Sequence, residues 1–386
     1  MSALLEGLFN GVSIGAVLLI AALGLAIVFG LMGVINLAHG ELMMLGAYTT
    51  FVVQNVFKGF GSPLFDTYIF FALPMAFLVS GLVGLLLERG VIRFLYGRPL
   101  ETLLATWGVS LILQQFVRSV NGMLAIALAV FCLLFFGGLQ VLQRRSEWER
   151  IRGKAIAILL PLSLAIAALL GYFLYSNPVL ARPWFSARNV DVTAPAWLRG
   201  GLPLGGFQLP YTRLFIIVLT ALCLLGTYWF LNKSSWGLRI RAVTQNRQMS
   251  ACLGIPTNQV DALTFALGSG LAGIAGCAIS FLGSVGPNVG QNYIVDTFMV
   301  VVVGGVGNLL GTIIAAMAIG VTNYLIGSGT FALMSSSIAA LQPITDFFNF
   351  FATTSMAKVM VFALIIAFLQ FKPAGIFAPK GRTAEL

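Results

Sequence analysis

The segment around residues 30–46 places amide and ionisable side chains inside an otherwise apolar run. Asn36, His39 and Glu41 lie here among glycines, and His39 is the only histidine of the chain. Ionisable groups are costly at membrane depth, so they usually face a bundle interior or a water-filled cavity. His39 and Glu41 therefore either line a path for a polar solute or lock two helices together. The lock is favoured, because a single histidine has no metal-binding companions here.

A second polar set has the spacing of a helix. Thr106, Ser110 and Gln114 recur at i, i+4 and i+8 within 101–120, which puts them on one helix face. Their hydroxyl and amide groups can donate and accept hydrogen bonds without charge, which suits a small uncharged polar solute. Residues of these types also hold membrane helices together, so packing is an equally good interpretation.

A short apolar stretch, 294–303, runs directly into the glycine-rich segment 304–311. Broken, glycine-rich backbone at membrane depth is tolerated only where it is buried in protein or lines a cavity. We therefore predict a half-helix or re-entrant segment here. Asp296 is a candidate for helix capping, gating or solute contact, and Asn308 is a further candidate for the solute path.

The sequence offers no further centre for chemistry. It has one histidine, no catalytic pair of carboxylates and no nucleophile motif, and its four cysteines are far apart: Cys132, Cys223, Cys252 and Cys277. A Gly-x-x-x-x-Gly-Lys-Ser/Thr phosphate loop is also absent, so the chain does not bind ATP by that mechanism. We expect neither an enzyme nor a resident metal or cofactor.

Membrane-spanning helices must position these residues. Of 386 residues, 59% are hydrophobic and only 9% are charged, whereas an ordinary soluble domain carries about 25% charge. A bilayer core about 30 Å thick needs roughly 20 apolar residues per helix. Runs nearly free of charge are 8–31, 67–87, 124–142, 156–175, 214–231 and 359–371. We predict one all-α, polytopic transmembrane helical bundle over 1–386, with broken or re-entrant helices.

The basic residues predict the topology. They gather at 89–98, 144–154, 233–247 and 372–382, and the positive-inside rule places all four clusters in the cytoplasm. Each cluster flanks a hydrophobic span, so topology explains them better than nucleic-acid binding does. The Pro- and Gly-rich stretch 176–213 is then an ordered outer loop.

The third basic cluster belongs to a loop at 233–260 that predicts a docking element. Met249, Cys252 and Leu253 fall at i, i+3 and i+4, which makes one apolar face of a short helix, and Gly254 ends it. A cytoplasmic amphipathic helix of this kind either fits a socket on a partner protein or lies on the bilayer surface.

These segments carry a family resemblance. The loop and the following residues 262–273 resemble the coupling loop of ABC-importer permeases of the branched-chain amino acid family. Asn36-Leu-Ala-His39-Gly40-Glu41, with Gly46-Ala47-Tyr48, resembles that family's N-terminal signature. The segments 40–50, 104–115 and 189–198 are similar to the urea permease branch in particular.

The resemblance implies a second, related permease subunit, two ATP-binding subunits, an extracytoplasmic solute-binding protein and a bacterial inner membrane whose lipid surrounds the bundle. It places these residues at the ATPase contact: Arg239, Arg241, Arg247, Gln248, Met249, Leu253 and Gly254. Two departures occur. The family's Glu-Ala-Ala is replaced by Gln248-Met249-Ser250, so docking would depend on the apolar face and the arginines. Residues 123–183 look like an inserted helical hairpin.

The combined interpretation is a permease subunit of an ATP-driven importer for urea. A branched-chain amino acid or short-amide permease is the first alternative, although a zwitterion needs charged groups and the path candidates are mainly neutral. A passive urea channel or a secondary transporter is a further alternative, and the predicted cytoplasmic docking helix argues against it because neither needs one. A structural membrane subunit needs no polar residues at membrane depth.

Overall fold

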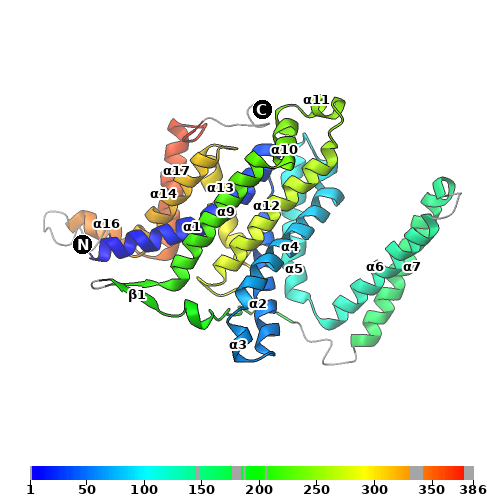
Figure 1. The fold of residues 1–386 in the computed structure, drawn as a ribbon, viewed down its shortest axis with the longest axis horizontal. Coiled ribbons are helices and arrows are strands. Elements are labelled where there is room, and N and C mark those ends of the chain that lie inside the picture. Colours follow the sequence, from blue (N-terminus) through cyan, green and yellow to red (C-terminus); the bar gives the residue numbers. More distant parts are fainter. Residues whose placement is uncertain are drawn as a thin grey trace. The chain divides into compact units, whose positions relative to one another are not determined.

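The structure is a computed structural model that describes residues 2–143, 148–175, 184–185, 188–204, 207–330 and 342–377. It divides into two compact units, one formed by residues 1–111 and 190–386 and the other by residues 112–189. Figure 1 gives the order of the elements along the chain. Each unit is described by itself.

The first unit is built from helices and one small hairpin. Its helices are α1 (Ser2–Met32), α2 (His39–Lys58), α3 (Ser62–Phe65), α4 (Tyr68–Gly90), η1 (Ile92–Phe94), η2 (Ala196–Leu198), α9 (Tyr211–Lys233), α10 (Ser235–Gln245), α11 (Arg247–Cys252), α12 (Thr257–Ile279), α13 (Val289–Gly304), α14 (Leu309–Gly327), α16 (Gln342–Phe351) and α17 (Thr354–Phe371). The strands β1 (Gly201–Leu204) and β2 (Phe207–Pro210) pair antiparallel. Helix α5 (Pro99–Ser119) begins in this unit and ends in the second.

Among the described residues, eight helices are long and apolar enough to cross a membrane, and α13 and α17 supply shorter apolar helices. The predicted all-α, polytopic membrane fold is therefore confirmed. The apolar runs predicted from composition fall within α1, α4, α6 (Gly122–Gln143), α7 (Trp148–Tyr175), α9 and α17, apart from single residues at their ends. The chain is a multi-pass membrane protein.

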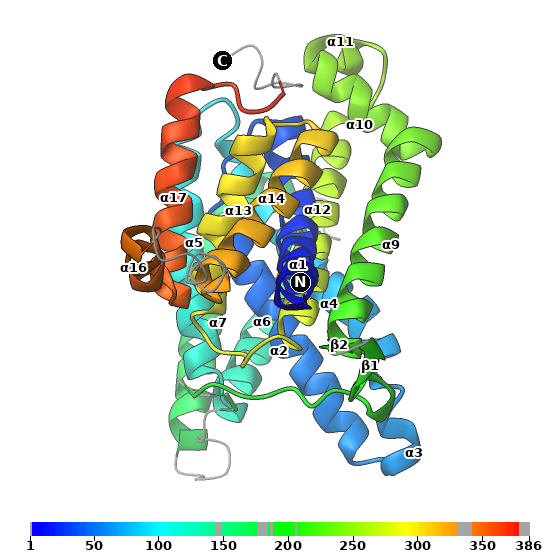
Figure 2. The same cartoon turned by 90° about the vertical axis from the view of Figure 1, so that its left-hand side faces the viewer.

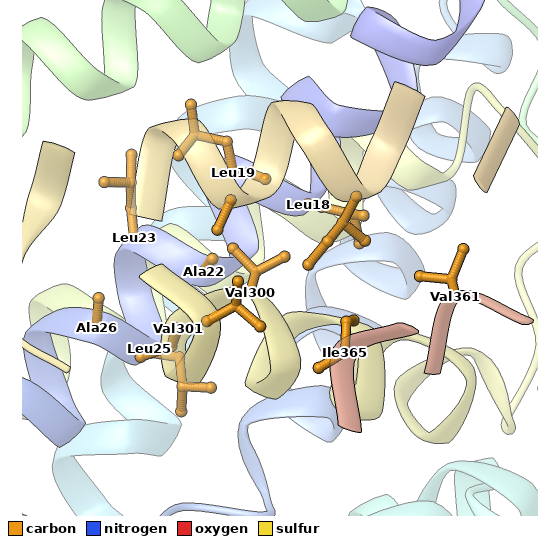
Figure 3. Close-up of a cluster of buried hydrophobic side chains, with 14 of the residues drawn as sticks. Leu18, Leu19, Ala22, Leu23, Leu25, Ala26, Val300, Val301, Val361 and Ile365 are labelled. Carbon is orange, nitrogen blue, oxygen red and sulfur yellow. The ribbon is translucent and has the colours of Figure 1, made fainter. Parts of the chain in front are cut away.

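Helix α1 is the centre of the first unit. Its most apolar window is 83% buried, and it packs between α12 and α14, as Figure 2 shows. Leu18, Leu19 and Leu23 of α1 belong to one apolar cluster with Val300 of α13 and Ile365 of α17 (Figure 3). A helix that is apolar on all sides is buried in this way, so α1 can contact several neighbouring helices at once.

The two ends of the first unit differ in character. Helices α10 and α11 lie at the same end as the last turn of α17, and the strands and α3 lie toward the opposite end (Figure 2). By the positive-inside rule, the basic cluster 233–247 and Lys372 predict that the first end is cytoplasmic. At the other end the outer loop is ordered where it is described, because Val190 pairs with Val285 and the Tyr68 hydroxyl donates to the carbonyl of Thr193 at 2.9 Å.

The half-helix or re-entrant segment predicted at 294–303 lies in a short apolar helix that is not among the eight candidate spans. These residues belong to α13, a continuous helix of 16 residues, which is about 24 Å long at 1.5 Å per residue. Its first turn was missed because it contains polar residues at 291 and 292. Of the predicted apolar stretch 331–351, the structure describes the ten-residue α16.

The second unit contains the end of α5 and the antiparallel pair α6 and α7. The backbone N–H of Trp184 donates to the carbonyl of Val120 at 2.9 Å, which brings the two ends of the hairpin together. The predicted hairpin at 123–183 covers α6 and α7, and its last residues, 176–183, lie outside the described part of the chain. That the hairpin is an insertion stays a prediction.

Candidate functional site

The segment between α1 and α2 is shaped by Asn36. Its side chain is buried, with 2% of its surface exposed, and its Oδ1 accepts a hydrogen bond from the backbone N–H of Ala38 at 3.1 Å. Asn side chains stabilise such turns by bonding to backbone two residues further on. The turn carries the chain from the end of α1 at Met32 into the start of α2 at His39.

His39 ties α2 to the middle of α1. The side chain is fully buried, and its Nε2 lies 3.0 Å from the carbonyl oxygen of Ala21. A carbonyl only accepts hydrogen bonds, so Nε2 carries the proton and donates. This contact is the geometry expected of a helix lock, and the Nδ1 atom finds no hydrogen-bond partner in the part of the chain that the structure describes.

Two residues of the predicted polar face of α5 meet the same segment. The hydroxyl of Thr106 accepts from the backbone N–H of Leu37 at 3.2 Å, and the hydroxyl of Ser110 donates to Glu41 Oε1 at 3.1 Å. Both are buried. Helical spacing thus puts Thr106 against the turn and Ser110 against the first turn of α2. Gln114, one turn further along α5, belongs to the second unit, where it is buried.

Glu41 also lies against the start of α13. A Cβ at Gly290 would lie 2.8 Å from Glu41 Oε2 and 2.6 Å from the backbone of Gly40, so only glycine permits this approach. The partial positive charge at a helix N-terminus stabilises a nearby carboxylate. Asn36, His39, Glu41, Thr106 and Ser110 therefore form one buried group, which we call the polar cluster.

Asp296 does not cap α13, and its predicted roles in gating or solute contact stay predictions. It lies in the second turn of the helix and not at its end. Its carboxylate accepts from Lys358 Nζ of α17 at 2.8 Å, and the same amine donates to the carbonyl of Asn292 at 3.1 Å. The amine also lies 5.7 Å from the ring centre of Tyr293. Sequence analysis did not identify Lys358, although a lysine within an apolar run was the signal.

Asn308 caps α14. Its side chain accepts from the backbone N–H of Gly311. The preceding turn needs glycine, because Gly305 has a φ of +94° and its α-carbon faces the backbone of Phe377. Asn308 also lines a cavity of about 410 Å³ together with Arg241 of α10, so the structure brings one path candidate close to one predicted coupling residue.

The predicted coupling loop forms two short helices with defined starts. The side chains of Ser234 and Asn246 accept backbone N–H groups at the starts of α10 and α11. Gly254, with a φ of +81°, follows the end of α11. Met249 and Leu253 are 59% and 75% exposed, so the apolar face predicted from their spacing is directed away from the bundle.

The arginines of this loop separate into two groups. Arg239 lies over the ring of Trp236, at 4.9 Å from its centre, and Arg241 is exposed, as is Gln248. Arg247 instead points toward the bundle, where its Nη2 lies 2.8 Å from Asp261 Oδ2 of α12 and its guanidinium lies 5.0 Å from the ring centre of Tyr96.

Tyr96 extends this contact to α4. Its hydroxyl donates to Glu88 Oε1 at 3.0 Å. Burial, together with the nearby carboxylates of Asp261 and Glu88, raises the pKa of Tyr96 far above its ordinary value, so the phenol keeps its proton. Asp261 and Glu88 were missed from sequence, although two carboxylates inside apolar spans were a usable signal. No group of three or more His, Cys, Asp or Glu that could hold a metal occurs among the described residues.

Comparison with known proteins agrees with this arrangement. The family described as the permease component of the branched-chain amino acid transport system matches residues 7–369. The high-affinity branched-chain amino acid transport system permease proteins BraD of Pseudomonas aeruginosa and LivH of Escherichia coli K12 are each 25% identical over 374 residues, which cover 96% of this chain and 95% and 94% of theirs. The xylose transport system permease protein XylH of Haemophilus influenzae is 32% identical over 111 residues, 27% of this chain and 29% of that protein. No solved structure matches.

Proposed function

Because the chain belongs to the permease component family of the branched-chain amino acid transport system, we propose that it is one translocating subunit of an ATP-driven importer and that its solute is urea. The observation that carries the choice of urea is the polar cluster. Apart from Glu41 it offers uncharged donors and acceptors, and the Glu41 carboxylate can accept from the N–H groups of an amide. The similarity of three segments to the urea permease branch supports the same choice.

The exposed face of α11 supports ATP-driven transport. Met249 and Leu253 present apolar side chains at the cytoplasmic end of the unit, where a socket on an ATP-binding subunit would cover them. On this proposal the chain works in a bacterial inner membrane with a related permease, two ATP-binding subunits and an extracytoplasmic binding protein. A passive channel or a secondary transporter has no ATP-binding subunit, so this apolar face would have no such partner to bind.

A branched-chain amino acid is the second candidate solute, and a specific observation favours it. The Asp296 and Lys358 pair offers one group of each sign inside the bundle, and a zwitterion needs both. The relatives BraD and LivH are named for branched-chain amino acids. The urea hypothesis therefore places the solute at the polar cluster, whereas the branched-chain amino acid hypothesis places it at the pair of Asp296 and Lys358.

Uptake of labelled urea and labelled leucine would separate the candidates. Cells that contain the partner subunits would be compared with and without this chain, and with an ATP-binding subunit that cannot hydrolyse ATP. We expect urea uptake that needs both the chain and hydrolysis. Leucine uptake alone would replace urea by the second candidate, and urea uptake independent of hydrolysis would indicate a channel.

A further inference from the structure

A cavity of about 340 Å³ lies at the cytoplasmic end of the polar face of α5. It is lined by Met32, Gly33, Val34, Leu95, Tyr96, Gly97, Arg98, Pro99, Thr102 and Arg247. Thr102 is buried and lies one turn before Thr106 on the same helix face. Its hydroxyl donates to the carbonyls of Arg98 and Leu95 at 2.8 and 3.0 Å.

The cavity and the polar cluster are therefore consecutive along one helix. Thr102 and Ser110, with Thr106 between them, are eight residues apart on α5, which is about 12 Å at 1.5 Å per residue. Opposite them runs the segment between α1 and α2, of which Gly33 and Val34 line the cavity and Leu37 bonds to Thr106. Helix α5 and the segment between α1 and α2 therefore lie opposite each other from the buried Glu41 to the cavity.

Arg247 forms part of the wall of this cavity and is the first residue of α11. About a third of its side chain is exposed, and three contacts hold it: Asp261, the Tyr96 ring and Asn258 Oδ1 at 3.3 Å. Helix α11 is short and is bounded by its Asn246 cap and by Gly254. A force on its exposed apolar face would therefore move Arg247 relative to α4, α5 and α12.

We propose that this cavity is the cytoplasmic end of the solute path and that Arg247 is its latch. With Arg247 held between Asp261 and Tyr96 the end is closed, and displacement of α11 by a partner subunit withdraws the guanidinium and opens it. The inference rests on the proposed transport function, but it assigns to Arg247 a task beyond partner contact. The partner subunit would push on Met249 and Leu253, and the resulting movement of Arg247 would open the cavity to the cytoplasm.

Cysteine labelling tests the latch without any transport. Thr102→Cys, in a chain whose four native cysteines are replaced by serine or alanine, would be exposed to a small methanethiosulfonate reagent in inside-out vesicles. Arg247→Gln should raise the labelling rate several-fold. The matched control, Arg241→Gln, changes an exposed arginine of α10 that does not line this cavity and should leave the rate unchanged. Equal rates in all three proteins would overturn the proposal.

A cross-link tests the same step in the transporting complex. Tyr96→Cys and Arg247→Cys would be joined by a short, reducible thiol cross-linker, with each single cysteine variant as its control. We expect uptake to fall by ten-fold or more, to return on reduction, and co-purification of the ATP-binding subunit to persist. Undiminished uptake in the cross-linked protein would refute the latch while leaving the transport proposal intact. Absence of hydrolysis-dependent uptake in the unaltered chain would instead refute the transport proposal, and the labelling result would still decide the latch.

Discussion

Single side chains join the elements of the candidate site, and the contact of Ser110 with Glu41 is the easiest to test. Its hydroxyl is the donor that reaches Glu41 Oε1 from α5. Replacing Ser110 by Val at nearly constant volume should cost about 1–3 kcal/mol, because a buried carboxylate loses a donor. We expect slower urea uptake by several-fold, altered discrimination between urea and thiourea, and a lower Tm in detergent. Ser119→Val, at an exposed serine of the same helix, is the control. Normal kinetics and an unchanged Tm would show that this bond serves neither transport nor stability.

The Asp296 and Lys358 pair allows a charge-based test at the same scale. Asp296→Asn or Lys358→Met alone leaves one charged partner uncompensated, which should cost roughly 1–3 kcal/mol after allowance for the exposed part of Lys358. The double variant should recover much of this loss, because no unpaired charge remains. If urea is the solute, the double variant keeps its uptake. Loss of leucine uptake with recovered stability would identify the pair as a zwitterion site.

At the level of helices, the sequence predicted which segments form apolar helices, but not which helices pack against each other. Hydropathy identifies α1, α4, α6, α7, α9 and α17, because a bilayer sets their length. It could not show that α13 begins at Val289, because its first turn contains Gln291 and Asn292, which are polar and exposed. The spacing of Thr106 and Ser110 predicted one helix face, but not that the face meets Leu37 and Glu41. Contacts between distant segments are not encoded in a local period.

Helix α11 illustrates the same limit and carries a prediction. Its apolar face and its end at Gly254 followed from spacing, whereas the inward direction of Arg247 depends on Asp261 and Tyr96, which are remote in sequence. Changing Met249 and Leu253 together to Asp would place two charges in the proposed socket, which should cost several kcal/mol of binding. We expect loss of co-purifying ATP-binding subunit from an inserted permease. Gln245→Asp, at an exposed polar position at the end of α10, is the control. Unchanged co-purification of the double variant would exclude docking through this face.

Considered as a whole molecule, the chain separates into a bundle that holds the polar cluster and a second unit built on α6 and α7. The first unit contains α10 and α11, the cavity next to Arg247 and the ion pair between α13 and α17. These features are the ones that the transport proposal uses. The second unit contributes an apolar surface groove lined by α6 and α7, which suits contact with lipid. The division predicts that the hairpin is dispensable for the transport step.

The ends of the hairpin make this prediction practical, because the hydrogen bond from Trp184 to Val120 brings them together. A short Gly/Ser linker that joins Gly122 to Ser186 begins and ends two residues beyond this bonded pair in sequence, and a flexible linker of a few residues closes at little entropic cost. We expect the shortened chain to insert, to co-purify with the ATP-binding subunit and to retain a measurable fraction of urea uptake. A lower Tm is compatible with this result, since α6 and α7 bury apolar surface against each other. The control replaces only residues 144–147 by the same linker and leaves α6 and α7 in place. Complete loss of uptake in a stably inserted deletion variant, with the control active, would show that α6 and α7 belong to the working core of the transporter.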